Sequence, residues 1–143
     1  MDIKILLADD FPEIRQGIRQ LLEAHNGWTV VAEAEDGKEA LEMALDVTPD
    51  VAVIDIGMPK MNGLDLAREL HKRLPNTEIL MVTQYDAKQV VEESLRAGAR
   101  GYVLKSSVGA ELVPAVEAAS QHKRFISPAI IESSGQLYNE SLA

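Results

Sequence analysis

The chain carries an adjacent pair of acids, a third acid, a hydroxyl and a lysine, and each follows directly after a short apolar run. Carboxylates that lie close together repel one another, and an oxygen-only cluster without His or Cys suits Mg²⁺. A carboxylate beside Mg²⁺ can attack a phosphoryl group, while an ammonium and a hydroxyl can stabilise the phosphoryl oxygens. The residues that predict this chemistry are Asp9, Asp10, Asp55, Thr83 and Lys105.

Short apolar runs, the candidate strands, alternate along the chain with segments whose apolar residues have helical spacing. The third run is apolar on both faces, as expected for the central strand of a covered parallel sheet. Alternation of this kind predicts a parallel sheet with helices on both faces, joined by right-handed crossovers. The expected strands are residues 3–8, 28–34, 51–54, 79–82 and 101–104.

The predicted sheet gathers the reactive side chains at one edge. In open α/β sheets, ligands bind beyond the carboxyl ends of the strands, near the point where the strand order reverses. In a sheet of order 2-1-3-4-5 the first and third strands are neighbours, so Asp9, Asp10 and Asp55 would share one pocket. A single strand-end Asp is commonly a solubilising residue, whereas the whole set at one edge indicates a functional site.

Local signals predict where several helices begin and end. Asp36 and Glu39 form a capping box, and Gly98 is suited to a left-handed helix end. Pro114 lies inside the last helical pattern, and its ring lacks the N–H that a helix uses. We expect that helix to be distorted in its first two turns or to begin near Glu111.

Composition limits the classes of protein that the chain can belong to. Its 143 residues, 46% apolar and 26% charged, fit one globular domain. No apolar run is long enough to cross a membrane and no secretory signal is present, so we expect a cytoplasmic protein. The absence of Cys excludes disulfides and thiolate sites, and a net charge of −9 argues against direct nucleic-acid binding by this segment.

Four stretches together resemble the receiver domain of bacterial two-component response regulators. The resemblance covers about residues 1–128, and it implies a three-layer flavodoxin-like fold with a five-stranded parallel sheet of order 2-1-3-4-5. The stretches that carry it are Leu7–Asp10, Asp55–Gly63, Val82–Thr83 and Gly98–Lys105.

The resemblance implies a role for each residue of the predicted pocket. Asp55 resembles the phosphoacceptor, and Lys105 the lysine that pairs with Asp55 or with its phosphate. Asp10 resembles the direct Mg²⁺ ligand, Asp9 the acid that reaches the metal through water, and the Gly57 backbone carbonyl the third protein ligand.

The resemblance also implies a switch. Thr83 and Tyr102 resemble the pair in which the hydroxyl closes on the phosphate and the aromatic ring moves into the vacated space. Gln84 follows Thr83 at the rim of the pocket, and we expect its bulk to shield the phosphate from water and to slow the entry of phosphodonors. Phe11 stands beside the acidic pair, where receivers of the NarL/FixJ (LuxR-type) subfamily often have His.

The runs Gly98–Ser106 and Phe125–Pro128 resemble the NarL/FixJ (LuxR-type) subfamily, in which a C-terminal helix-turn-helix binds DNA. We expect a receiver domain at residues 1–124 and a linker or tail at 125–143, with the DNA-binding domain absent from this chain. The implied partners are a sensor histidine kinase and, after phosphorylation, a second copy of the chain, while DNA is reached only through the absent domain and no membrane is involved.

Two interpretations of the chain within this family remain open. It is either the receiver part of a longer transcription regulator or a stand-alone receiver that serves as a phosphate shuttle or protein-interaction switch. In both cases the resemblance implies a signalling switch with self-catalysed phosphotransfer and autodephosphorylation, rather than an enzyme that acts on other substrates.

Two alternatives from other classes are less well supported. A phosphatase of the haloacid dehalogenase type needs a second acid two residues after its nucleophile, and that position is Gly57. A flavodoxin-type module needs a Ser/Thr/Gly-rich phosphate loop after the first strand, where Asp9 and Asp10 would instead repel phosphate. A flavin absorbance spectrum would test the flavodoxin-type alternative.

Overall fold

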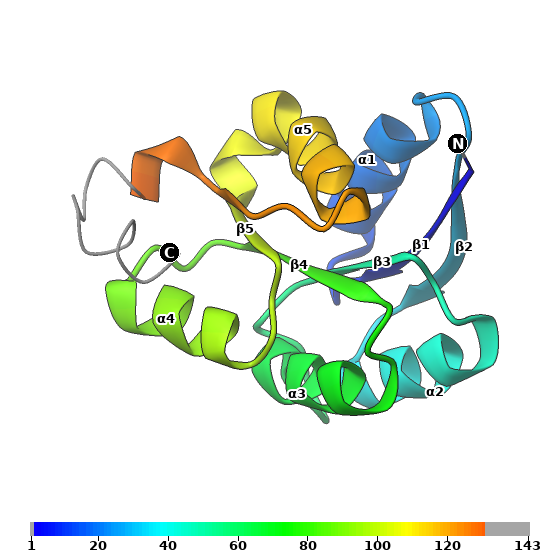
Figure 1. Ribbon diagram of the computed structural model, residues 1–143, viewed down its shortest axis with the longest axis horizontal. Coiled ribbons are helices and arrows are strands. Elements are labelled where there is room, and N and C mark those ends of the chain that lie inside the picture. Colours follow the sequence, from blue (N-terminus) through cyan, green and yellow to red (C-terminus); the bar gives the residue numbers. More distant parts are fainter. Residues whose placement is uncertain (1, 131–143) are drawn as a thin grey trace.

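The computed structural model describes residues 2–130 as a parallel sheet covered by helices on both faces. The strands are β1 (Ile3–Ala8), β2 (Trp28–Ala34), β3 (Val51–Ile54), β4 (Glu78–Thr83), β5 (Gly101–Leu104) and β6 (Phe125–Ile126). The helices are α1 (Pro12–Glu23), α2 (Gly37–Val47), α3 (Gly63–Arg73), α4 (Lys88–Arg96) and α5 (Val108–Ser120), with a 3₁₀ turn, η1 (Lys105–Ser107), before α5. Helices α1 and α5 cover one face, and α2, α3 and α4 cover the other (Figure 1).

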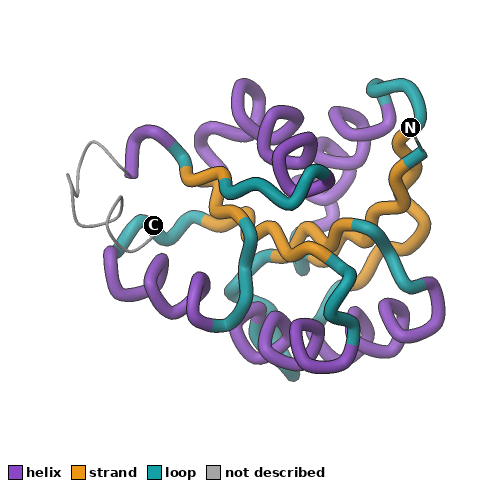
Figure 2. The backbone as a smooth tube through the Cα atoms, viewed as in Figure 1, coloured by secondary structure: helices purple, strands orange, loops and turns teal. Residues whose placement is uncertain are grey.

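The sheet order is β2-β1-β3-β4-β5-β6, which confirms the predicted arrangement of the first five strands. The predicted number of strands was wrong, because β6 adds a sixth strand parallel to β5 (Figure 2). This strand has only two residues, which is too short for a periodic pattern that would predict it from the sequence. Ile126 and Ser127 are buried, and the Ser127 hydroxyl donates to the carboxylate of Glu111 on α5. Ordered structure therefore continues past residue 124.

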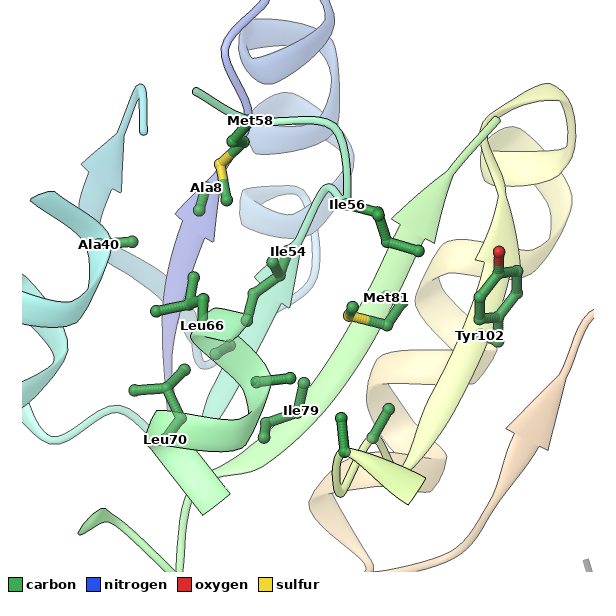
Figure 3. Close-up of a cluster of buried hydrophobic side chains, with 14 of the residues drawn as sticks. Ala8, Ala40, Ile54, Ile56, Met58, Leu66, Leu70, Ile79, Met81 and Tyr102 are labelled. Atoms are coloured by element: carbon green, nitrogen blue, oxygen red, sulfur yellow. The ribbon is translucent and has the colours of Figure 1, made fainter. Parts of the chain in front are cut away.

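The sheet is held by an apolar layer on each face. Along β1, Leu6 and Ala8 face the cluster under α2, α3 and α4, whereas Ile5 and Leu7 face the cluster under α1 and α5. In Figure 3, Leu66 of α3 lies over the strands of the first cluster, and this side chain is fully buried. Because every strand from β1 to β5 is packed on both faces, the carboxyl ends of the strands form a rigid edge.

The predicted helix ends are partly confirmed. The Glu39 N–H donates to the Asp36 side chain at 2.8 Å, and Gly98 has a φ of 107° just after α4. The reciprocal bond of the capping box forms with a different residue: the Glu39 carboxylate accepts from the N–H of Glu35 at 3.2 Å.

We expected the last helix either to be distorted in its first two turns or to begin near Glu111, and the second alternative was wrong. Helix α5 begins at Val108, not near Glu111, and continues through Pro114. The proline removes only one backbone hydrogen bond. The fully buried side chains of Leu112 and Val116 pack against the sheet, and this burial stabilises the helix on both sides of the proline.

Candidate functional site

The carboxyl ends of β1 and β3 bring the predicted acids together. Asp9, Asp10 and Asp55 each offer one carboxylate oxygen, and these oxygens all lie within 4.8 Å of one another. Asp9 is 1% exposed and Asp55 is 5% exposed, while Asp10 is partly buried. The neighbourhood of β1 and β3 in the sheet, which the sequence predicted, produces this cluster.

One oxygen of the acid cluster has no protein partner. Asp10 Oδ1 is buried and accepts no hydrogen bond, whereas Asp9 Oδ1 accepts from the backbone N–H of Phe11 at 2.8 Å. A buried carboxylate oxygen without a donor is costly unless a cation or water satisfies it. The donor set around it is entirely oxygen, which is the set that Mg²⁺ prefers.

Lys105 brings a positive charge to the cluster from the end of β5. Its Nζ lies 3.1 Å from Asp9 Oδ2 and 3.3 Å from Asp55 Oδ2, so one ammonium bridges two of the three acids. The same Nζ lies 5.3 Å from the centre of the Phe11 ring, within the range of a cation–π contact. Phe11 is itself more than half exposed, so this ring forms part of the rim of the site.

The carboxyl group of Asp55 is perturbed by its surroundings. Burial raises the pKa of Asp55 above its ordinary value, and the charge of Asp9 raises this pKa further. The charge of Lys105 and a hydrogen bond from the Gly57 backbone act in the opposite direction. Asp55 is therefore a buried carboxyl group whose ionised form depends on the neighbouring ammonium.

The predicted switch residues lie next to the cluster and are joined through Tyr85. Thr83 is fully buried at the end of β4, and its Oγ1 accepts from the Tyr85 N–H at 3.3 Å. Tyr102 is fully buried on β5, and its hydroxyl donates to the Tyr85 carbonyl at 2.5 Å. Figure 3 shows the Tyr102 ring beside β4 with its hydroxyl directed toward the carboxyl end of the sheet. A shift of the Tyr85 backbone would thus disturb the hydrogen bonds of both Thr83 and Tyr102.

Gly57 and Gln84 lie on the two loops that border the acid cluster. Both residues are exposed, Gly57 in the loop after Asp55 and Gln84 in the loop after Thr83. A Cβ atom at position 57 would lie 3.6 Å from the Tyr85 hydroxyl oxygen, so the Tyr85 phenol lies close to the Gly57 backbone. Tyr85 therefore lies beside the Gly57 loop, and the placement of Gln84 at the rim of the pocket stays a prediction.

Sequence reasoning missed two residues that contact this site. Tyr85 acts through its backbone N–H and carbonyl, which carry no signal in the side-chain pattern. Arg15 of α1 donates from Nη1 to the Asp9 carbonyl at 2.7 Å, but in the sequence it is one of several charged residues on a helix. Its place three residues after the Pro12 helix start is the only signal that could have suggested it.

A parallel α/β sheet carries three carboxylates and a lysine at the ends of β1, β3 and β5, which is the arrangement that the resemblance to receiver domains implies. Residues 5–117 match the response regulator receiver domain family, and the chain belongs to this family. Within the described residues, no helix is both long enough and apolar enough to span a membrane.

The curated relatives of the chain are named as transcriptional regulatory proteins or response regulators. The chain is 40% identical over 119 residues to the uncharacterized transcriptional regulatory protein YxjL of Bacillus subtilis, which covers 83% of this chain and 55% of that protein. It is 35% identical over 130 residues to the response regulator GacA of Pseudomonas syringae, with coverage of 91% and 61%. The chain therefore spans little more than half the length of these relatives.

Solved structures place the chain among LuxR-type regulators. A LuxR-family two-component response regulator from Aurantimonas matches with a TM-score of 0.90 and 36% identity, covering all of both chains. The receiver domain of the NarL response regulator from Mycobacterium tuberculosis matches with a TM-score of 0.80 and 33% identity, over 84% of this chain and 97% of that one. These matches confirm the predicted flavodoxin-like fold and the LuxR-type resemblance.

Proposed function

We propose that Asp55 accepts a phosphoryl group from a sensor histidine kinase in an Mg²⁺-dependent reaction, and that the phosphorylated domain switches an output surface. The observation that carries this proposal is the cluster of Asp9, Asp10 and Asp55 with the Lys105 ammonium 3.3 Å from Asp55. The cluster combines a nucleophile, a cation site and a fixed positive charge at one edge of the sheet.

The described residues fit an Mg²⁺ ion. Asp10 and Asp55 supply carboxylate oxygens, Asp10 Oδ1 has no other partner, and the Gly57 carbonyl and a water held by Asp9 would complete the protein's share. Mg²⁺ takes few protein ligands and keeps several waters, so this small set is sufficient. When bound, the ion would neutralise negative charge on the transferred phosphoryl oxygens.

The chain's own groups account for the transfer. A carboxylate oxygen of Asp55 attacks phosphorus, and the bond from phosphorus to the imidazole nitrogen of the kinase breaks. Lys105 keeps the buried Asp55 ionised before the attack, and its ammonium then pairs with a phosphoryl oxygen. The Thr83 hydroxyl, at the carboxyl end of β4, would donate to a second phosphoryl oxygen.

The switch follows from the hydrogen bonds around Tyr85. If the Thr83 hydroxyl turns to the phosphoryl group, Thr83 Oγ1 gives up the Tyr85 N–H that it accepts in this structure. The loop that carries Gln84 and Tyr85 then shifts, and Tyr102, which is bonded to the Tyr85 carbonyl, follows it. The surface formed by α4, β5 and α5 changes in consequence, and a phosphorylation-dependent homodimer is the expected response.

The output of the full protein is proposed from the relatives. The first of them is named a transcriptional regulatory protein, and the chain spans 55% of its length. We therefore infer that residues 1–124 are the receiver of a cytoplasmic LuxR-type regulator and that 125–143 lead to a C-terminal domain that binds DNA. A stand-alone receiver that shuttles phosphate or switches a protein contact is the alternative, and a reading frame that stops after Ala143 would favour it.

Incubation with acetyl phosphate and Mg²⁺, followed by intact mass spectrometry, tests the proposal. The chain should gain one phosphoryl group, and EDTA should prevent the gain. Asp55→Asn should abolish it, whereas Asp65→Asn, which changes an exposed acid on α3, should not. Undiminished labelling of Asp55→Asn, or labelling that survives EDTA, would refute the assignment.

A further inference from the structure

Arg15 of α1 contacts the backbone of the acid cluster. Its side chain is 14% exposed, and its Nη1 donates to the Asp9 carbonyl oxygen at 2.7 Å. Arg19, one turn further along the same face of α1, is 44% exposed and pairs with Glu23 and Glu33. The two arginines share a helix and a partner, but among their described contacts only that of Arg15 reaches the site.

The Asp9 carbonyl lies just beyond the hydrogen-bond ladder of the sheet. The last ladder contacts of β1 are the Asp9 N–H to the Ala34 carbonyl at 3.1 Å and the Asp55 N–H to the Ala8 carbonyl at 2.9 Å. The next acceptor along the strand is the Asp9 carbonyl, and Arg15 supplies its donor. The guanidinium therefore supplies a hydrogen bond to the backbone at the end of β1, beyond the last hydrogen bonds that β2 and β3 make with this strand.

This carbonyl belongs to the peptide unit that joins the two acids. A peptide unit is planar, so fixing the direction of the Asp9 carbonyl also fixes the Asp10 N–H and the two Cα atoms on either side. The Asp9 and Asp10 side chains leave from those Cα atoms toward the cluster. Asp10 Oδ1 is buried there and accepts no hydrogen bond, so this oxygen is not held by a hydrogen bond of its own.

The guanidinium is itself fixed at more than one point. Its Nε donates to Glu33 Oε1 at 3.2 Å, and its Nη2 lies 3.7 Å from Glu35 Oε1. Both acids belong to β2 or to the residue that follows it. Because these carboxylates neutralise the positive charge of Arg15, the contribution of Arg15 to the cluster is orientation rather than net charge. The planar fork of arginine suits such a task, since it donates in several fixed directions.

We propose that Arg15 is a positioning residue of the cation site: it holds the Asp9–Asp10 peptide so that both carboxylates are preset for a divalent cation. The inference deepens the proposed function and rests on it. Groups that orient metal ligands from behind typically change metal affinity by about 10- to 100-fold when they are removed. We expect the lower end, about 10-fold, because the sheet ladder still restrains Asp9 from one side.

Titration with Mg²⁺ alone, followed by the amide shifts of ¹⁵N-labelled protein, measures this affinity without any phosphoryl transfer. Arg15→Met keeps the aliphatic bulk and removes the guanidinium donors, and the matched control is Arg19→Met, which removes the other arginine that pairs with Glu33. We expect Arg15→Met to weaken Mg²⁺ binding about 10-fold and Arg19→Met to change it less than 2-fold. Thermal melts of all proteins in EDTA report stability separately.

The outcomes distinguish the inference from the function beneath it. If the wild-type chain binds Mg²⁺ but Arg15→Met binds it equally well, or Arg19→Met weakens it as much, Arg15 has no positioning role. If the wild-type chain shows no saturable Mg²⁺ binding, the proposed function fails, and the inference about Arg15 fails because it rests on that function. Should Arg15→Met not fold, Arg15→Lys keeps the charge without the fork, and we expect it to weaken Mg²⁺ binding several-fold; wild-type affinity would overturn the inference.

Discussion

Replacing Lys105 with Met should destabilise the metal-free protein, because it leaves two buried acids without their shared cation. The ammonium lies 3.1 Å from Asp9 and 3.3 Å from Asp55, and these acids are 1% and 5% exposed. At an effective dielectric constant of about 20, each pair attracts by about 5 kcal/mol before desolvation is counted. Desolvation offsets several kcal/mol per ion, and removal of one partner from a buried pair typically costs about 3–5 kcal/mol.

We expect the lower figure, about 3 kcal/mol, because Lys105 retains some exposure and the acids can take up protons. For a chain of this length the loss corresponds to a melting temperature lower by about 10 °C. Urea denaturation at pH 7 in EDTA measures it, with the fluorescence of the buried Trp28 as the probe. The control is Lys88→Met, which removes an exposed pair with Glu92 and should cost less than about 1 kcal/mol.

The pH dependence gives this prediction a second signature. Burial raises the pKa of Asp55, and the charge of Lys105 lowers it. Removing Lys105 therefore lets the pKa of Asp55 rise further in the folded state. A group with a raised folded-state pKa favours the folded state at low pH, and that advantage is lost as the pH rises through the raised value. The deficit of Lys105→Met should thus be largest near neutrality and shrink as the pH falls toward about 4. A loss no larger than that of Lys88→Met, or one independent of pH, would refute this reasoning.

Three further substitutions test other parts of the structure. Gln84→Ala should speed both the phosphorylation of Asp55 and its loss by about 3- to 10-fold, a barrier change of about 1 kcal/mol, and a mutant that loses phosphate more slowly would favour a water-orienting role instead. Gly37→Ala should unfold or strongly destabilise the chain, because its Cβ would lie 1.9 Å from the Met61 carbonyl oxygen, and a normal melting temperature would contradict the packing of that loop on α2. Gly17→Ala should stabilise the chain by about 0.5–1 kcal/mol in urea denaturation, because no atom lies within 4 Å of the new methyl group and α1 gains helix propensity, and a destabilised variant would contradict this.

Much of the fold could be predicted from the sequence because a reactive side chain follows directly after each of several apolar strands. Residues 5–8 before Asp9 and residues 51–54 before Asp55 are all apolar, and the reactive residues follow them directly, so the pattern marks both the strand and its functional end. The order of the strands then places the acids side by side. Lys105 was predictable for the same reason, since it follows β5 at the same edge.

The features that escaped prediction depend on contacts between distant parts of the chain. Strand β6 has two residues and forms because β5 offers a free edge beside the α5 core. Tyr85 matters through its backbone groups, which every residue type carries. Arg15 gains its importance only when α1 lies against the end of β1, and apart from its place soon after Pro12 its sequence neighbourhood does not separate it from Arg19.

The most direct test of the account is to locate the phosphoryl group by chemical trapping. After reaction with acetyl phosphate and Mg²⁺, borohydride reduction converts an aspartyl phosphate to homoserine, and peptide mass spectrometry then identifies the position. We expect homoserine at position 55, with Asp9 and Asp10 unchanged and no homoserine in samples reacted in EDTA. Homoserine at position 9 or 10, or a phosphoryl group found on a Ser, Thr or His instead, would contradict the assignment of Asp55 as the phosphoacceptor.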